Sequence, residues 1–96
     1  MRLRFDPAAR AEYVAAVERY KAESLDHGRE FAEEFRAAVN AVLAFPRSYA
    51  ADAEGVRKRV LRNYPYALVY RLEEDMVEVL ACAHTSRRPG YWKDRL

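Results

Sequence analysis

The sequence has few of the residues from which metal, redox and phosphate sites are built. Its 96 residues include one cysteine, two histidines and three glycines. A single cysteine excludes an internal disulfide and a cysteine-based metal cluster. His27 and His84 have no further ligands at metal-binding spacing, and so few glycines exclude a glycine-rich phosphate loop. We therefore expect a protein without a bound metal and without a cofactor.

A long apolar segment is also missing. No unbroken apolar run is longer than residues 66–70, whereas a membrane-spanning helix needs about 20 apolar residues. Residues 1–6 alternate between polar and apolar side chains and lack the apolar centre of a signal peptide. Apolar residues make up 51% and charged residues 33% of the chain, as in a globular protein. We expect a single domain over residues 1–96, located in the cytoplasm and without a membrane partner.

The first half of the sequence predicts a short strand followed by two helices. Leu3 and Phe5 alternate with arginines, as in a strand with one buried face. Asp6 and Pro7 then mark a helix start, because aspartate caps free backbone N–H groups and proline tolerates the first helical position. Gly28 is assigned to the turn between the two helices.

Apolar residues at helical spacing predict which faces of these helices pack inward. They are Ala9, Tyr13, Ala16, Val17 and Tyr20 in the first helix, and Phe31, Phe35, Ala38, Val42 and Phe45 in the second. Polar residues such as Glu12 and Glu18 are assigned to the opposite, solvated face. Two apolar helix faces joined by a short turn form a hairpin that needs a sheet to cover it.

The second half predicts three strands, at residues 56–62, 66–73 and 76–83. Alternation predicts shared faces for Tyr66, Leu68, Tyr70 and Leu72, and for Val77, Val79, Ala81 and Ala83. Pro65 falls in the bend before the middle strand, and Asp75 is expected near the left-handed conformation in the turn after it. The expected fold is α+β: an N-terminal strand, a helical hairpin packed on a mostly antiparallel four-stranded sheet, and a short basic, aromatic tail.

Charge is unevenly distributed along the chain. Residues 1–54 carry eight basic and ten acidic side chains, whereas residues 55–96 carry nine basic and five acidic ones. The basic second half suits an anionic partner, and Arg57, Arg59 and Arg62 form a basic stripe within it. The alternative is a set of solvated arginines at strand edges.

A basic, aromatic segment, Arg87-Arg88-Pro89-Gly90-Tyr91-Trp92, follows the last strand at once. Arginine, tyrosine and tryptophan often dominate the energetics of protein interfaces. Arg87, Arg88, Tyr91 and Trp92 are therefore the expected target-binding surface, with the basic stripe as a secondary one. The alternative is a C-terminal segment that packs over the sheet.

This tail, together with Tyr66-Ala67-Leu68-Val69-Tyr70-Arg71, resembles the RelE/ParE superfamily of small bacterial toxins, and most of all its ParE-like, plasmid-stabilisation members. The resemblance implies the toxin of a type II toxin–antitoxin system that inhibits growth by binding DNA gyrase. It also implies a cognate antitoxin, expected to be of the ribbon–helix–helix type. The toxin would then meet DNA only through that antitoxin.

RelE-like members of the superfamily imply an alternative function, ribosome-dependent cleavage of messenger RNA. They typically carry two phosphate-holding arginines and a tyrosine further on. This sequence has Ala67 and Thr85 at the arginine positions and Tyr91 at the tyrosine position, and a methyl group cannot stabilise a phosphorane. The alternative therefore assigns catalysis to other residues: His84, Arg71, Arg87 and Tyr91. A third possibility is a non-toxic relative that acts as a binding module.

Overall fold

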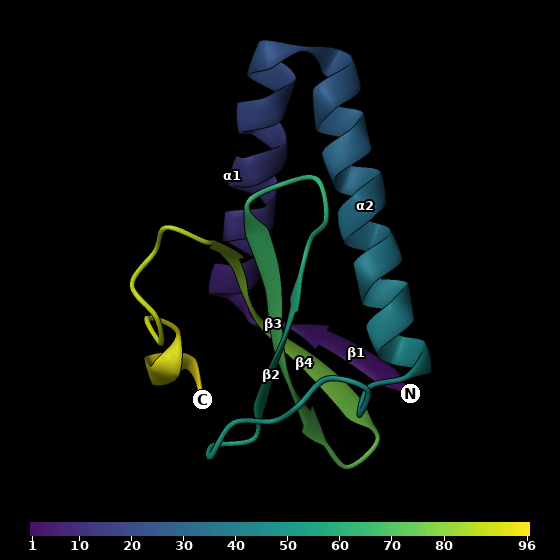
Figure 1. Ribbon diagram of the computed structural model, residues 1–96, viewed down its shortest axis with the longest axis vertical. Helices are drawn as coiled ribbons and strands as arrows, with labels where there is room; N and C mark the ends of the chain where they lie inside the picture. The colour runs from purple at the N-terminus through teal and green to yellow at the C-terminus, as the bar shows by residue number, and fades with distance from the viewer.

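The computed structural model describes residues 1–96 and has two layers (Figure 1). Its elements are β1 (Arg2–Phe5), α1 (Pro7–Glu23), α2 (Leu25–Ala44), β2 (Val56–Val60), β3 (Tyr66–Glu73), β4 (Met76–His84) and a 3-10 turn, η1 (Lys93–Arg95). One layer is the α1–α2 hairpin, and the other is a four-stranded sheet in the order β1-β4-β3-β2. β1 is parallel to β4, and the other neighbours are antiparallel. The expected α+β fold is confirmed.

β1 covers only the first part of β4. Asp6 caps α1 with its carboxylate and Pro7 occupies the first helical position, so the chain leaves the sheet directly after Phe5. Phe5 pairs with Val79, whereas β4 continues to His84. The outer edge of β4 beyond Val79 therefore has no strand neighbour, and its backbone groups need other partners.

The aromatic residues predicted on the inner helix faces form the centre of the core. Phe31 and Phe35 are buried, and the ring centroids of Tyr13 and Phe35 lie 4.8 Å apart. Each buried phenylalanine contributes about 1.5–3 kcal/mol of transfer free energy. Phe45 is the exception to the predicted face and is 69% exposed. Phe45 does not continue the inner helix face, because α2 ends at Ala44 and Phe45 adopts the non-helical angles φ −137° and ψ 66°.

The turn between the helices is at Ser24 and not at Gly28, which corrects the sequence-based assignment. The backbone N–H of Ser24 donates to the carbonyl of Tyr20 at 3.1 Å, and its Oγ accepts from the N–H of His27 at 3.0 Å. One extended residue thus ends α1 and caps α2. Gly28 is buried inside α2, where a Cβ would lie 2.3 Å from the Cγ of Lys21. Glycine is needed there for close helix contact.

A β-bulge changes which residues of β4 face the helices. The pairing skips Leu80, since Val79 and Ala81 pair with consecutive residues of β3. Val79 packs with the helices, but beyond the bulge Cys82 takes that side. Ala81 and Ala83 belong instead to the cluster on the opposite face. The shared face predicted for β4 is therefore wrong beyond Val79.

The remaining boundaries differ from the prediction only locally. β2 ends at Val60, earlier than expected, and Pro65 lies in the bend before β3. The left-handed residue after β3 is Glu74, with φ 53°, and not Asp75. Asp75 instead anchors β1, because its carboxylate accepts from the guanidinium of Arg2 at 3.1 Å and its carbonyl accepts from the Arg2 N–H at 2.8 Å.

Candidate binding surfaces

The tail after β4 packs on the face of the sheet that the helices leave uncovered (Figure 1). Trp92 is only 8% exposed and belongs to the apolar cluster of Val69, Leu80 and Ala83. Gly90, with φ 77°, permits the turn that brings the indole to the sheet. Trp92 thus fastens the tail, and its ring offers little surface to a target.

Tyr91 lies at the centre of a cluster of cations and rings. The guanidinium carbon of Arg87 lies 4.0 Å from its ring centroid, and that of Arg95 lies 5.2 Å away. The rings of Tyr91 and Trp92 meet edge to face, with centroids 5.4 Å apart. The Tyr91 hydroxyl donates to Oε2 of Glu12 at 2.9 Å. Burial, and then the hydrogen bond to Glu12, raise the pKa of Tyr91 to about 12, so the phenol keeps its proton at neutral pH.

Glu12 and Arg95 close the open edge of β4. Oε1 of Glu12 accepts from the backbone N–H of Cys82 at 3.1 Å, and both carboxylate oxygens accept from Arg95 at 3.0 Å. Arg95 also donates to the carbonyl of Leu80 at 2.8 Å. The two side chains are 17% and 16% exposed. Backbone groups that β1 leaves unpaired therefore meet a partly buried ion pair.

Sequence reasoning missed this ion pair. It assigned Glu12 to the solvated face of the first helix and gave Arg95 no role. The two residues lie 83 positions apart, so no local spacing connects them. The only indication is the difference in strand length. β1 has four residues and β4 has nine, so part of the β4 edge has backbone groups that side chains must satisfy.

The positions that correspond to the superfamily's arginines lie in a small hollow beside the tail. Ala67, Thr85 and Tyr91 line it together with Lys58 and Arg87, and its volume is about 190 Å³. Two cations therefore lie close to Ala67 and Thr85, the positions at which the superfamily carries arginines. The hydroxyl of Tyr91, however, is already hydrogen-bonded outside this group. The hollow therefore brings two cations together with His84, which also lines it, whereas the hydroxyl of Tyr91 is engaged by Glu12.

His84 and Cys82 occupy the end of β4. The Nδ1 atom of His84 lies 2.7 Å from the Oγ of Ser86 and accepts from the Ser86 N–H at 3.1 Å. Its ring packs edge to face on Tyr66, with centroids 5.0 Å apart. Cys82 is buried, and burial raises the pKa of its thiol to about 12. His84 is thus held locally, and Cys82 is part of the core.

Arg71 lies far from the tail. Its guanidinium pairs with Glu78 and Glu73, each at 2.9 Å. In the β3–β4 ladder Arg71 is five residues from Tyr66, the partner of His84, which is about 17 Å along a strand. The structure therefore places His84 beside Arg87 of the tail, and leaves Arg71 neutralised at the other end of the sheet.

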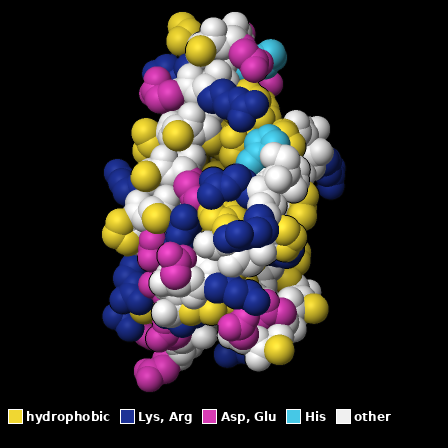
Figure 2. All heavy atoms as spheres, turned by 90° about the vertical axis from the view of Figure 1, so that its left-hand side faces the viewer, with side chains coloured by type: hydrophobic (Ala, Val, Ile, Leu, Met, Phe, Trp, Pro, Cys, Tyr) yellow, Lys and Arg dark blue, Asp and Glu magenta, His cyan; other side chains and the backbone are white.

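Arg87, Arg88 and Lys93 are the exposed cations of the tail, and Lys93 pairs with Glu54 at 3.5 Å. The guanidinium of Arg87 stacks on the ring of Tyr91, and the hydrogen bond to Glu12 holds that ring in place. Figure 2 shows Lys and Arg side chains running down the middle of the face that carries α1 and the tail, with apolar side chains on both sides. This face presents basic and apolar groups together.

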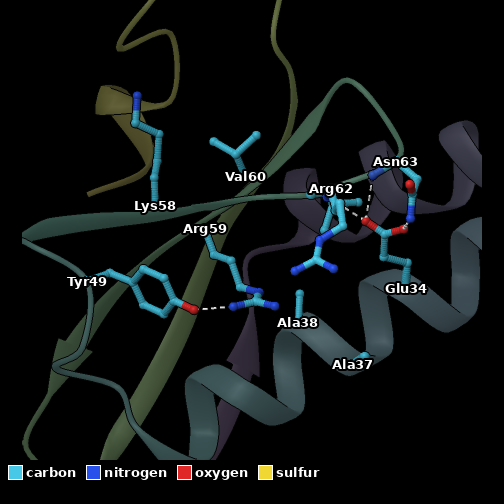
Figure 3. A pocket seen from close by; sticks show the side chains of 10 residues that line it. Glu34, Ala37, Ala38, Tyr49, Lys58, Arg59, Val60, Arg62 and Asn63 are labelled. Carbon is cyan, nitrogen blue, oxygen red and sulfur yellow. Dashed lines mark hydrogen bonds between the residues drawn. The ribbon is translucent and has the colours of Figure 1, made fainter.

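The arginines of β2 point to the opposite side of the sheet. Arg59 extends toward α2, whereas Lys58 and Val60 extend away from it (Figure 3). Arg57 donates to the carbonyl of Tyr49, and Arg59 donates to the Tyr49 hydroxyl. The Nε atoms of both arginines are buried and have no hydrogen-bond acceptor.

A groove of about 450 Å³ separates α2 from β2 (Figure 3). It is lined by Glu34, Arg59 and Arg62 among others. The Glu34 carboxylate accepts from the backbone N–H groups of Arg62 and Asn63 at 2.6 and 3.1 Å. Burial opposes ionisation of Glu34, but the hydrogen bonds from Asn63 and Arg62 outweigh it and lower the pKa. The basic stripe and the tail are therefore two surfaces on opposite faces of the sheet.

The model of the family described as the ParE toxin of the type II toxin–antitoxin system, parDE, matches residues 3–89. The chain belongs to the ParE toxin family. A solved structure from the chromosomal ParDE toxin–antitoxin system of P. aeruginosa has a TM-score of 0.64 and 17% identity, over 90% of this chain and 97% of that chain. Similarity at this identity shows a shared fold. No curated protein matches the chain.

This ParE toxin is thus a component of a type II toxin–antitoxin system, and that membership implies an antitoxin partner. The family match ends at residue 89, so Tyr91, Trp92 and Arg95 lie outside it. None of the helices combines the length and the apolar character that crossing a membrane requires.

Proposed function

We propose that this ParE toxin acts in the cytoplasm and inhibits growth by binding DNA gyrase through its tail. A cognate antitoxin of the ribbon–helix–helix type neutralises it and carries the complex to operator DNA. The observation that carries the proposal is the arrangement of the tail: exposed Arg87 stands on the ring of Tyr91 at 4.0 Å, with exposed Arg88 beside it. Trp92 fastens the whole segment to the sheet.

Such a surface is prepared for binding before a target arrives. A guanidinium stacked on an aromatic ring gains about 0.5–1 kcal/mol at an exposed site, and it loses less side-chain freedom when a partner docks. Tyr91 in turn is fixed by its hydrogen bond to Glu12. The tail therefore offers oriented positive charge without a bound ligand to order it.

A binding role agrees with these residues better than RNA cleavage does. Cleavage at the 2′-hydroxyl needs a proton acceptor, a proton donor and cations at the same phosphate. The pKa of Tyr91 is raised to about 12, so the phenol keeps its proton, and its hydroxyl donates a hydrogen bond to Glu12. Arg71 is paired with two carboxylates at the far end of the sheet.

The proposal is tested by adding purified toxin to a gyrase supercoiling assay. We expect inhibition by the natural chain and a loss of at least about tenfold in potency for the double variant Arg87→Ala, Arg88→Ala. Arg36→Ala, which removes an exposed arginine of α2, is the matched control and should leave inhibition unchanged. Unaltered supercoiling at micromolar excess of the natural chain would contradict the proposal.

Two cellular readouts separate the alternatives. Message cleaved on translating ribosomes after induction, and protected in Tyr91→Phe, would replace gyrase binding with the interferase function. Overexpression without growth arrest would favour the non-toxic binding module instead. Intact message together with arrested growth is the outcome that the proposal expects.

A further inference from the structure

Two partly buried arginines of β2 lack an anionic partner within the chain. Arg71 and Arg95 face carboxylates at 2.9 and 3.0 Å. Arg57 and Arg59 instead meet neutral oxygens of Tyr49 and the nearby loop, and the guanidinium of Arg59 also lies 5.7 Å from the centroid of the Tyr49 ring. The Nε of each is buried and has no acceptor. Buried polar groups normally find hydrogen-bond partners, and a desolvated cation without a counter-charge is costly. This region therefore suits an anion supplied from outside.

The backbone edge of β2 is open beside these arginines. Val56 is closed off, because its N–H donates to Oδ1 of Asp52 and its carbonyl accepts from the Asp52 N–H, both at 2.9 Å. Residues in an antiparallel strand alternate between facing their partner strand and facing outward. The backbone groups of Lys58 and Val60 therefore point outward like those of Val56, and β2 is an edge strand. An added strand can pair with them.

The two sides of this edge differ in chemistry. On the helix side lies the groove with the guanidinium groups of Arg59 and Arg62. On the tail side lies a wider groove of about 730 Å³, lined by Val60, Pro89 and Trp92 among others. Val60 itself is 61% exposed. Successive side chains of an added strand enter these two sides in turn.

We propose that the groove between α2 and β2 binds acidic side chains of the antitoxin, on a segment that pairs with β2 as a strand. The segment alternates acidic residues, which face Arg59 and Arg62, with apolar residues, which face Val60. Nη1 of Arg59 donates to Tyr49 and Nε is buried, so Nη2 is the donor that remains for a carboxylate oxygen entering the groove. The identity of the occupant rests on the proposed neutralisation by an antitoxin.

The test uses the full chain and a labelled synthetic peptide of about eight residues, the length of a short strand. The peptide alternates glutamate with valine, and its twin carries glutamine in place of glutamate. Fluorescence anisotropy should show the acidic peptide binding at least about tenfold tighter than its twin. Arg59→Gln should abolish this preference, and Arg62→Gln should reduce it. Arg36→Gln, which removes a charge outside the groove, should leave it intact.

Several results would overturn the proposal. They are equal affinity for the two peptides, no binding of either at millimolar concentration, and an acidic preference that survives in both Arg59→Gln and Arg62→Gln. Displacement of the peptide by an RNA oligonucleotide, with the same dependence on Arg59, would assign the groove to phosphate instead. Circular dichroism of each variant checks the fold, and Arg62→Gln at an exposed turn position serves if Arg59→Gln does not fold.

Failure of this proposal is distinguishable from failure of the proposed function. The basic stripe lies on the opposite face of the sheet from the tail, so we assign it to the antitoxin and not to the secondary target-binding role expected from the sequence. Arg59→Gln should therefore inhibit gyrase like the natural chain. The double variant Arg87→Ala, Arg88→Ala should keep the peptide preference and lose inhibition. Each surface thus has a readout that the other does not affect.

Discussion

At the open edge of β4, Arg95 lies 3.0 Å from the carboxylate of Glu12, whereas at the open edge of β2, Arg59 meets only the neutral hydroxyl and ring of Tyr49. Both arginines are partly buried. The edge of β4 is completed by the chain itself. The edge of β2 keeps unmatched charge beside unpaired backbone groups, and open edges of this kind are where other chains add. Unmatched charge therefore distinguishes the edge that a partner completes from the edge that the fold completes.

The closed edge also positions the tail. Glu12 accepts from Arg95 and from the Tyr91 hydroxyl, and the Tyr91 ring supports Arg87. Closure of β4 and presentation of Arg87 thus depend on the same carboxylate. The β2 edge has no such link to the tail. Removing the charge of Arg95 should therefore cost stability, whereas removing the charge of Arg59 should cost only partner binding.

Replacing Arg95 or Arg59 with methionine, each in its own variant, tests whether the two edges differ in what they contribute to stability. Arg95→Met should lower the free energy of unfolding by about 2–3 kcal/mol, because it leaves the Glu12 carboxylate and the Leu80 carbonyl without their donor. Arg59→Met should change it by no more than about 0.5 kcal/mol or raise it, because no carboxylate loses a partner. Urea unfolding followed by Trp92 fluorescence measures both.

Arg36→Met is the matched control for these variants, since Arg36 is exposed on α2, and it should be close to neutral. Equal losses for Arg95→Met and Arg59→Met would show that the two edges are alike. A loss confined to Arg59→Met would reverse the comparison.

Raising the pH tests the closed edge of β4 without a mutation, through the titration of Tyr91. Burial and the hydrogen bond to Glu12 raise the pKa of Tyr91 to about 12 in the folded state, whereas an unfolded tyrosine titrates near about 10. The contribution of Tyr91 to stability is therefore complete below about pH 10 and is lost as pH rises toward the folded pKa. Unfolding free energies at rising pH should fall less steeply for Tyr91→Phe than for the natural chain. Parallel curves would place the Tyr91 hydroxyl in water.

Local patterns predicted the elements of the fold because burial follows helical and strand periods. Phe31 and Phe35 show this, since both lie on the predicted inner face. Long-range features had no such signal. The Glu12–Arg95 pair joins residues 83 positions apart, and the bulge at Leu80 depends on the register of two strands.

The tail shows that sequence-based prediction has the same limit at the candidate binding surface. Its residue types predicted a binding surface, but residue types do not tell which face each side chain presents. Trp92 covers the sheet, whereas Arg87 and Arg88 remain exposed. The groove on β2 was likewise visible only as a basic stripe, since the missing counter-charges of Arg57 and Arg59 depend on what folds around them.

The smallest effect that we expect at the open edge of β2 comes from replacing Glu34. Glu34 is the only acidic residue that lines the groove, and it accepts backbone hydrogen bonds at the end of β2. Glu34→Gln should lower the free energy of unfolding by about 0.5–1 kcal/mol, because a charged acceptor becomes a neutral one. It should also raise the affinity for the acidic peptide by about two- to threefold, since one repelling charge is removed. Added salt should shrink this gain.

Glu33→Gln, on the neighbouring position of α2 but outside the groove, is the control and should leave peptide affinity unchanged. If Glu34→Gln binds the acidic peptide no better than the natural chain, or worse, then the peptide carboxylates do not enter beside Arg59. The unmatched charge of β2 would in that case serve some purpose other than recognition of an acidic strand, and the contrast between the two edges would lose its functional meaning.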